Sequence, residues 1–151
     1  MISAHHAGYV VDASVLVKWF LHEKEAERDR ALALRDLHIS GQSTIFIPQL
    51  ALLEVLNAIR FSPKADEDDG AAALEVLYDL HLETKAPDVD LLRKANAIAW
   101  AYKITIYDAL YVALGEQVGY PLITADEVMV KKLKGHSIVV ALRELEINER
   151  T

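Results

Sequence analysis

Short apolar runs alternate along this chain with longer segments in which apolar residues recur at helical spacing. The short runs are rich in β-branched and aromatic residues and are bounded by glycine, proline or polar residues, which is the pattern of strands. Predicted strands cover about residues 9–12, 44–47, 82–85, 122–124 and 137–140. Predicted helices cover about residues 14–20, 22–39, 48–59, 66–80, 87–102, 108–116 and 126–133, with a short helix near Leu142.

This alternation predicts a single α/β domain. Strands that alternate with helices favour a mainly parallel sheet covered by helices on both faces, that is, a three-layer α/β/α sandwich. The 151 residues are enough to bury a substantial core, and they contain no internal repeat and no low-complexity linker. We therefore expect one domain over residues 1–151, with its core at about 9–142, a short N-terminal extension and a polar C-terminal tail.

Composition narrows the class of protein further. Hydrophobic residues make up 52% and charged residues 26% of the chain, as in globular proteins. The net charge of −7 argues against a broad basic surface that binds nucleic acid through phosphate contacts alone, although bound cations could supply positive charge. The chain has no cysteine, which excludes thiolate metal sites and fits a reducing compartment. No apolar run reaches about 18 residues and no signal-peptide pattern is present, so we expect a cytoplasmic protein without a membrane segment.

Most of the 23 acidic residues have an ordinary structural explanation. Some lie in a mixed-charge helical segment, some in the polar tail, and others at predicted helix starts, where capping and the helix dipole favour acids. Four acids do not fit these explanations: Asp12, Glu54, Asp108 and Asp126.

Each of these four acids lies where a charge is expected to be at least partly shielded from water. Asp12 and Asp126 each follow a short apolar strand and precede a helix, so each could alternatively serve only as the N-cap of that helix. Glu54 lies among apolar residues and, if buried, needs a cation, a proton or a hydrogen-bond partner. Asp108 could be a first-turn acid with Thr105 as the cap, but its helix is apolar on nearly every side.

Acids from strand ends and from buried helices can meet only where helix starts gather above the carboxyl edge of the sheet, which is where α/β proteins bind ligands. Carboxylates that lie close together repel one another, so such a cluster needs a positive centre. No histidine is near any of the four in sequence, and oxygen-only ligation favours Mg²⁺ or Mn²⁺. A cation in such a pocket polarises a phosphoryl oxygen and activates water, which suits phosphodiester hydrolysis.

The segments around these acids resemble the motifs of PIN domains, the ribonuclease fold used by VapC-type toxins of toxin–antitoxin pairs. The similarity extends from about Tyr9 to Leu142 and is carried by four segments in the family's order. These segments are Val11-Asp12-Ala13-Ser14-Val15-Leu16-Val17-Lys18, Pro48 through Leu53-Glu54-Val55-Leu56-Asn57-Ala58, Tyr107-Asp108-Ala109-Leu110-Tyr111-Val112-Ala113-Leu114, and Leu122-Ile123-Thr124-Ala125-Asp126-Glu127. One such segment would be weak support, whereas four in order are specific.

The resemblance implies a five-stranded parallel sheet and a site in which Asp12, Glu54 and Asp108 hold Mg²⁺ or Mn²⁺. Asp126 would complete the pocket, directly or through water. Three further positions match polar residues that often line such sites: Ser14, Asn57 and Thr124. Their ordinary roles would be a helix cap, a partner that orients Glu54, and a strand residue. The resemblance also implies a homodimer and a small VapB-like antitoxin that wraps the toxin and blocks the acidic pocket.

The implied function is that of a metal-dependent endoribonuclease toxin. Metal-activated water would attack the phosphodiester in line and leave a 5′-phosphate and a 3′-hydroxyl. Lys18, Lys131 and Lys132 could guide RNA, although lysine runs are more often solvated surface. The alternative is a non-catalytic module of the same fold that binds RNA or protein. A phosphoaspartate-type phosphatase or a receiver domain fits less well, because Ser14 stands where the phosphatase needs a second acid and the Asp12 region supplies no acid pair.

Five aromatic residues lie on predicted helices, where core packing is the usual role. They are Trp19, Phe20, Trp100, Tyr102 and Tyr111. We expect most of them in the core and a minority at a contact with a second subunit or an antitoxin.

Overall fold

Five parallel strands form the central sheet. The computed structural model describes residues 2–3, 7–22 and 25–147. The sheet has the order β4-β3-β2-β5-β6, and each neighbouring pair runs parallel. Its strands are β2 (Gly8–Val11), β3 (Thr44–Pro48), β4 (Glu83–Lys85), β5 (Leu122–Thr124) and β6 (Val139–Ala141). The predicted parallel sheet of about five strands is confirmed.

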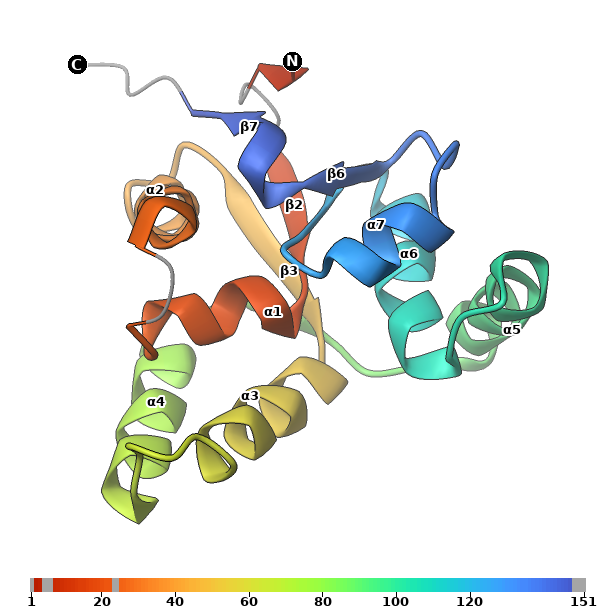
Figure 1. Cartoon of the computed structure of the whole chain (residues 1–151). Helices are drawn as coiled ribbons and strands as arrows, with labels where there is room; N and C mark the ends of the chain where they lie inside the picture. The colour runs from red at the N-terminus through yellow and green to blue at the C-terminus, as the bar shows by residue number, and fades with distance from the viewer. Residues whose placement is uncertain (1, 4–6, 23–24, 148–151) are drawn as a thin grey trace.

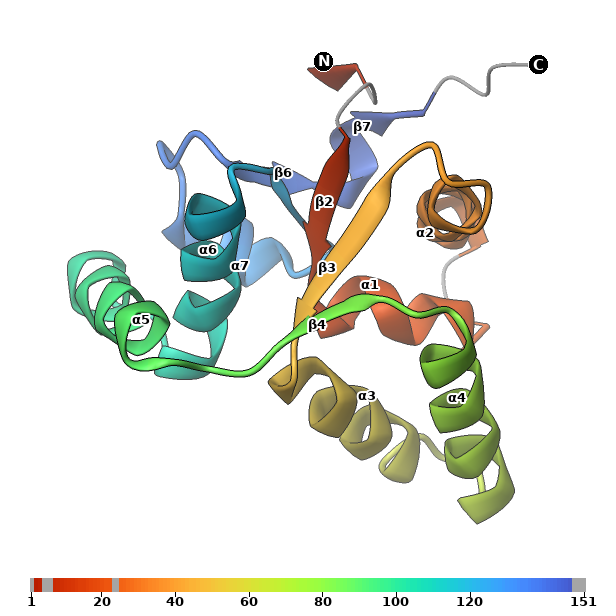
Figure 2. The ribbon, with the colours of Figure 1, turned by 180° about the vertical axis from the view of Figure 1, so that it is seen from behind.

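Helices cover both faces of this sheet, which confirms the three-layer α/β/α sandwich (Figure 1 and Figure 2). One layer contains α1 (Ala13–Leu16), α2 (Glu25–Ile39), α3 (Leu50–Arg60) and α4 (Glu67–Asp79). The other layer contains α5 (Val89–Tyr102), α6 (Ile106–Val118) and α7 (Glu127–Lys132). Two 3₁₀ turns, at Val17–Trp19 and Leu142–Glu144, follow α1 and β6.

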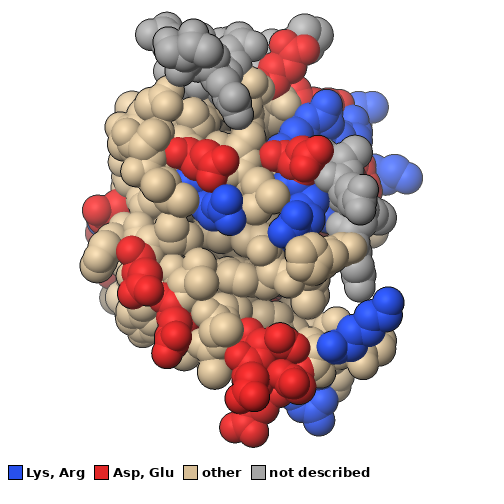
Figure 3. Space-filling view, turned by 90° about the vertical axis from the view of Figure 1, so that its left-hand side faces the viewer, with Lys and Arg blue, Asp and Glu red and all other residues tan. Residues whose placement is uncertain are grey.

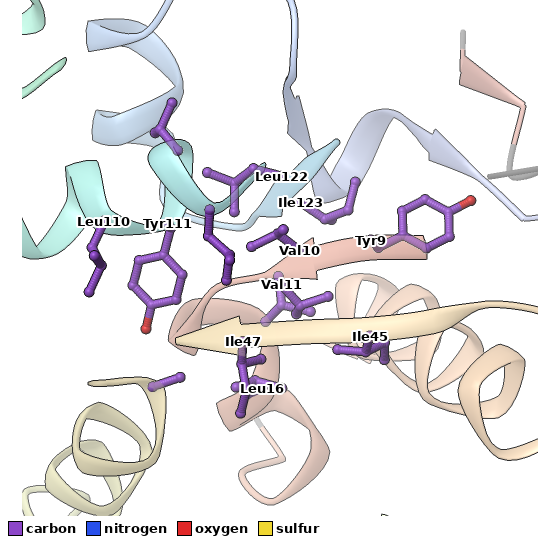
Figure 4. Packing of buried hydrophobic residues seen from close by; sticks show 14 of the residues in the cluster. Tyr9, Val10, Val11, Leu16, Ile45, Ile47, Leu110, Tyr111, Leu122 and Ile123 are labelled. Carbon is purple, nitrogen blue, oxygen red and sulfur yellow. The ribbon is translucent and has the colours of Figure 1, made fainter. Parts of the chain in front are cut away.

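The core reaches up to the carboxyl edge of the sheet through β2 and α6. Every residue of β2 is buried, and α6 is buried continuously from Ala109 to Gly115. Figure 4 shows apolar side chains of β2, β3 and β5 packed beside Tyr111 of α6. A Cβ at Gly115 would lie 2.6 Å from Cδ1 of Ile138, so glycine allows this close approach. The rigid core therefore fixes the strand ends and the first turns of the helices that follow them.

Several boundaries differ from the predictions. Pro48 is the last residue of β3 rather than the first of a helix, and α3 begins at Leu50. Helix α6 begins at Ile106, so Asp108 is its third residue and not its first.

Both chain ends contribute structure that the sequence did not suggest. β1 (Ile2–Ser3) pairs in parallel with β7 (Leu145–Glu146), within the segments expected to be an extension of no assigned role and a polar tail. The outer parts of these segments (1, 4–6 and 148–151) and the expected helix residues 23–24 lie outside the described residues.

The aromatic residues divide between core and surface. Trp19 and Tyr111 are buried, whereas Trp100 is 80% exposed and so belongs to the minority that does not pack in the core. The apolar stripe of α5 that faces the core contains Leu91, Ala95 and Ile98, and Trp100 lies off that stripe. Among the described helices, none is long and apolar enough to cross a membrane.

Candidate active site at the carboxyl edge of the sheet

Neighbouring parallel strands bring two of the four acids to one place. β2 and β5 are paired with Val11 opposite Ile123, and the backbone N–H of Asp12 donates to the carbonyl of Ile123 at 3.3 Å. Asp12 follows β2 directly, and Asp126 follows β5 by two residues. The two carboxylates are close enough for Asp126 to raise the pKa of Asp12.

Asp12 is a buried carboxylate with hydrogen-bond donors but no cationic partner among the described residues. It is 5% exposed and caps α1, where it accepts hydrogen bonds from the hydroxyl of Ser14 and, at 3.3 Å, from the backbone N–H of Val15. Burial raises its pKa from 3.8 to about 6, since water no longer solvates the anion. The donors Ser14, Thr124 and Val15 oppose this rise, and the charge of Asp126 adds to it.

Ser14 and Thr124 join the two strand ends. The Oγ of Ser14 accepts from the N–H of Ala125 at 2.8 Å and lies 3.4 Å from Oγ1 of Thr124. Thr124 is fully buried, and its Oγ1 accepts from the N–H of Asp126 at 3.1 Å. Two of the three predicted supporting residues, Ser14 and Thr124, therefore lie in this site, where they fix the positions of the two aspartates.

Asp126 is an N-cap as well as a neighbour of the other acids. Its Oδ1 accepts from the N–H groups of Val128 at 3.0 Å and Met129 at 3.2 Å, at the start of α7. Asp126 therefore does serve as an N-cap, as Asp12 does. The capping hydrogen bonds use only Oδ1 of Asp126. The charge of Asp126 also raises the pKa of Asp108, so Asp126 interacts with both Asp12 and Asp108.

Asp108 extends the group to the first turn of α6. Thr105 is the N-cap and accepts from the N–H of Asp108 at 3.1 Å. Burial raises the pKa of Asp108, Asp126 raises it further, and the positive charge of Lys132 opposes the shift. Lys132 is thus placed beside the acids from the last turn of α7.

Glu54, on α3, completes the group through Tyr111, a residue that the sequence does not predict as part of the site. The hydroxyl of Tyr111 donates to Oε1 of Glu54 at 2.6 Å. Burial and the charge of Asp108 raise the pKa of Glu54, whereas this hydrogen bond lowers it. The pKa of Tyr111 is in turn raised above its ordinary value by burial, by Glu54 and by the charge of Asp12. The four carboxylates therefore interact in the order Asp12, Asp126, Asp108 and Glu54.

Other predicted residues do not join the group. Asn57 is exposed, and among the described residues its side chain makes no hydrogen bond to Glu54. Lys18 is only 12% exposed and forms an ion pair with Glu27 at 3.2 Å, so its charge is already compensated. Lys131 is exposed on α7.

The donor chemistry of this edge fits a hard divalent cation. All four acids offer oxygen, which Mg²⁺ and Mn²⁺ prefer, and three of them have raised pKa values because burial and like charges disfavour the anions. No three acidic, histidine or cysteine side chains of the described part of the chain form a ready-made metal cage. The fit is therefore one of donor type and charge, with the carboxylates near one another but not converged on a single point.

Comparisons with known proteins identify the family of this chain. Ribonuclease VapC3 of Pyrobaculum aerophilum is 31% identical over 128 residues, which are 82% of this chain and 92% of that protein. The structure of VapBC2 from Rickettsia felis bound to a DNA fragment from its promoter has a TM-score of 0.64 at 16% identity, covering 94% of this chain and 99% of that chain. VapC20 of Mycobacterium tuberculosis is described as a Sarcin-Ricin loop cleaving toxin. Its structure has a TM-score of 0.62 at 16% identity, covering 82% of this chain and 93% of that chain. The family model of the PIN domain matches residues 9–134, a span that includes all four acids, and the chain therefore belongs to the PIN domain family.

Proposed function

We propose that this protein is a metal-dependent endoribonuclease and the toxin of a type II toxin–antitoxin pair. The observation that carries the proposal is the group of four carboxylates that interact at one edge of the sheet. The 31% identity to Ribonuclease VapC3 supports RNA as the substrate, and the likeness to the VapBC2 structure supports an antitoxin as the partner.

The proposed ligands of Mg²⁺ or Mn²⁺ are Asp12, Glu54 and Asp108, with Asp126 binding directly or through water. When bound, such a cation stabilises negative charge on the scissile phosphate and lowers the pKa of a water molecule. Because its pKa is about 6, Asp12 is mostly ionised at neutral pH and can act as a ligand there. The hydrogen bond from Ser14 keeps its carboxylate in a fixed orientation.

Approach of RNA to so acidic a pocket requires nearby positive charge. Lys132 is the better placed of the predicted lysines, since it already interacts with Asp108, and Lys131 precedes it on the exposed last turn of α7. Lys18 is a weaker candidate because of its ion pair with Glu27. We therefore assign RNA guidance to α7.

The proposed assembly follows the family. A VapB-like antitoxin would cover the acidic edge and so prevent access of RNA, and two copies of the chain would form a homodimer. We place this activity in the cytoplasm, where both RNA and the antitoxin would be available and where a chain without cysteine has no need of oxidising conditions.

Cleavage of a defined RNA panel tests the proposal. The wild-type chain should cut RNA with Mg²⁺ or Mn²⁺, fail to cut it with EDTA, and leave 5′-phosphate ends. Asp108→Asn should lose the activity, while Asp68→Asn, at an exposed acid of α4, should keep it. Cleavage that persists in EDTA would contradict metal dependence. RNA that is bound but never cut would favour the non-catalytic binding module instead.

A further inference from the structure

Tyr111 lies in the continuously buried stretch of α6, but its hydroxyl reaches the candidate site. Its side chain is 2% exposed, in the stretch of α6 that is buried on every side. In Figure 4 the ring packs beside the core of the sheet, and the hydroxyl oxygen points toward the arrowhead of β3 and the start of α3. A phenylalanine would fill the same apolar space, so the ring alone does not explain a tyrosine here.

The hydroxyl makes one side-chain hydrogen bond, to a proposed metal ligand, and it also interacts with the backbone of Ala13. It donates to Oε1 of Glu54 at 2.6 Å, and so joins α6 to α3 across the carboxyl edge. Hydrogen bonds from a hydroxyl to an ionised carboxylate are short and strong. Among the described residues, no hydrogen bond reaches the other oxygen, Oε2 of Glu54.

We propose that Tyr111 is the positioning residue of Glu54: it holds the carboxylate through Oε1 and leaves Oε2 as the oxygen offered to the cation. This inference rests on the proposed function, because it assumes that Glu54 is a ligand. Glu54 has several rotatable bonds, and freezing them beforehand lowers the entropy that binding must otherwise remove.

The proposed role agrees with how the neighbouring acids are held. Ser14 donates to Asp12, and backbone N–H groups of α7 donate to Asp126. Among the described residues, Asn57 makes no hydrogen bond to Glu54, so Tyr111 takes the orienting role that Asn57 could have had. Groups that hydrogen-bond to metal ligands commonly change metal affinity by about 10- to 100-fold when they are removed.

Binding of Mn²⁺, measured by calorimetry without RNA, tests this role. Tyr111→Phe removes only the hydroxyl and should raise the dissociation constant for Mn²⁺ by about tenfold. Tyr9→Phe is the matched control, because Tyr9 is also fully buried but its hydroxyl points away from the site at the far end of β2 (Figure 4). It should leave the dissociation constant within about twofold of wild type.

A double-mutant cycle tests whether the effect passes through Glu54. In a Glu54→Gln background, Tyr111→Phe should have little further effect on Mn²⁺ binding, because the partner carboxylate is already absent. An undiminished tenfold effect there would contradict the proposal, as would an unchanged affinity in Tyr111→Phe alone. A wild-type chain that binds no Mn²⁺ would overturn the metal-dependent function together with this inference, whereas equal binding by wild type and Tyr111→Phe would overturn only the role of Tyr111.

The same contact can be followed in the wild-type chain. Binding of Mg²⁺ to Glu54 should weaken the hydrogen bond that the Tyr111 hydroxyl donates to this carboxylate. The weaker hydrogen bond should change the near-ultraviolet circular dichroism of tyrosine. The change should persist in Tyr9→Phe. Its absence in a chain that does bind Mg²⁺ would count against the proposal.

Discussion

The chain carries two groups of four acids whose physical surroundings differ. The first group, the site acids, consists of Asp12, Glu54, Asp108 and Asp126. The second group, the α4 acids, consists of Asp66, Glu67, Asp68 and Asp69. The site acids come from segments far apart in sequence, whereas the α4 acids are consecutive.

The α4 acids are exposed and stabilise the helix that they begin. Asp66 accepts from the N–H of Asp69 at 3.0 Å, and Asp69 accepts from the N–H of Asp66 at 2.8 Å, which forms a capping box. In the space-filling view, acidic side chains gather in a dense patch at the lower end of the face that carries α4 (Figure 3). Water solvates these charges, and the helix dipole favours them.

The site acids are arranged in the opposite way. Burial removes water from Asp12 and partly from Glu54 and Asp108, and the charge of a neighbouring acid raises the pKa of each of these three further. Such an arrangement lowers stability unless a cation or proton neutralises it. The difference teaches that a run of acids is not itself a sign of function, whereas an acid at the end of a buried strand is a strong candidate.

The largest expected effect separates the two groups by activity. Asp12→Asn should lower RNA cleavage by about a hundredfold or more, since it removes one of the charges proposed to hold the cation. Asp68→Asn should change the rate by less than about twofold, because Asp68 is an exposed residue in the first turn of α4. Rates measured on one RNA at saturating Mg²⁺ would check both. Equal losses in the two variants would show that the activity depends on total charge rather than on the site.

The next effect concerns stability and has the opposite sign to the effect on activity. In EDTA at pH 7, Asp12→Asn should raise the free energy of unfolding by up to about 3 kcal/mol, because it removes a buried charge whose pKa is raised from 3.8 to about 6. Asparagine keeps the capping oxygen, so α1 should not lose its N-cap. Urea unfolding of the wild type and of Asp12→Asn provides the measurement. Addition of Mg²⁺ should reduce the difference between their free energies of unfolding, because the cation is expected to stabilise only the wild type. A variant that is less stable in EDTA would contradict the claim that the charge is destabilising.

A smaller effect is expected from pH alone. The folded chain binds a proton at Asp12 more tightly than the unfolded chain, so this stabilising contribution is fully present below about pH 4 and is lost as the pH rises through about 6. Lowering the pH from 7 to 5 in EDTA should therefore raise the free energy of unfolding by about 1 kcal/mol from this group. Glu54 and Asp108 shift in the same direction and should add to the rise. Denaturant curves at a series of pH values check this, and a rise of the same size in Asp12→Asn would assign the effect to other groups.

Much of this comparison could be made from sequence because it depends on local patterns. Apolar runs that end in Asp12 and Asp126 predict strands whose carboxyl ends meet, since parallel neighbours share one edge. The apolar surroundings of Glu54 and of the helix at Asp108 predict burial without any knowledge of contacts. The resemblance to the motifs of PIN domains then predicts that the four acids share one site.

The remainder depends on contacts between distant segments. Tyr111 lies 57 residues after Glu54, and on a helix that is apolar all round a tyrosine cannot be distinguished from an ordinary core residue. The pairing of Lys18 with Glu27 is equally invisible, because it depends on how α2 returns over the end of α1. Proline suits a first helical turn, so Pro48 predicts a helix start, but proline suits the end of a strand as well, which is where Pro48 lies.

The smallest expected effect concerns the α4 acids, where removal of an acid should lower stability instead of raising it. Asp66→Ala removes an acceptor of the capping box and should lower the free energy of unfolding by about 1 kcal/mol, the usual value of an N-cap. Asp66→Asn keeps the acceptor oxygen and should be nearly neutral. Urea unfolding at pH 7 in EDTA allows direct comparison with Asp12→Asn. If removal of Asp66 stabilised the chain as removal of the Asp12 charge is expected to do, simple repulsion within an acidic protein would explain both, and burial at the strand ends would lose its special role.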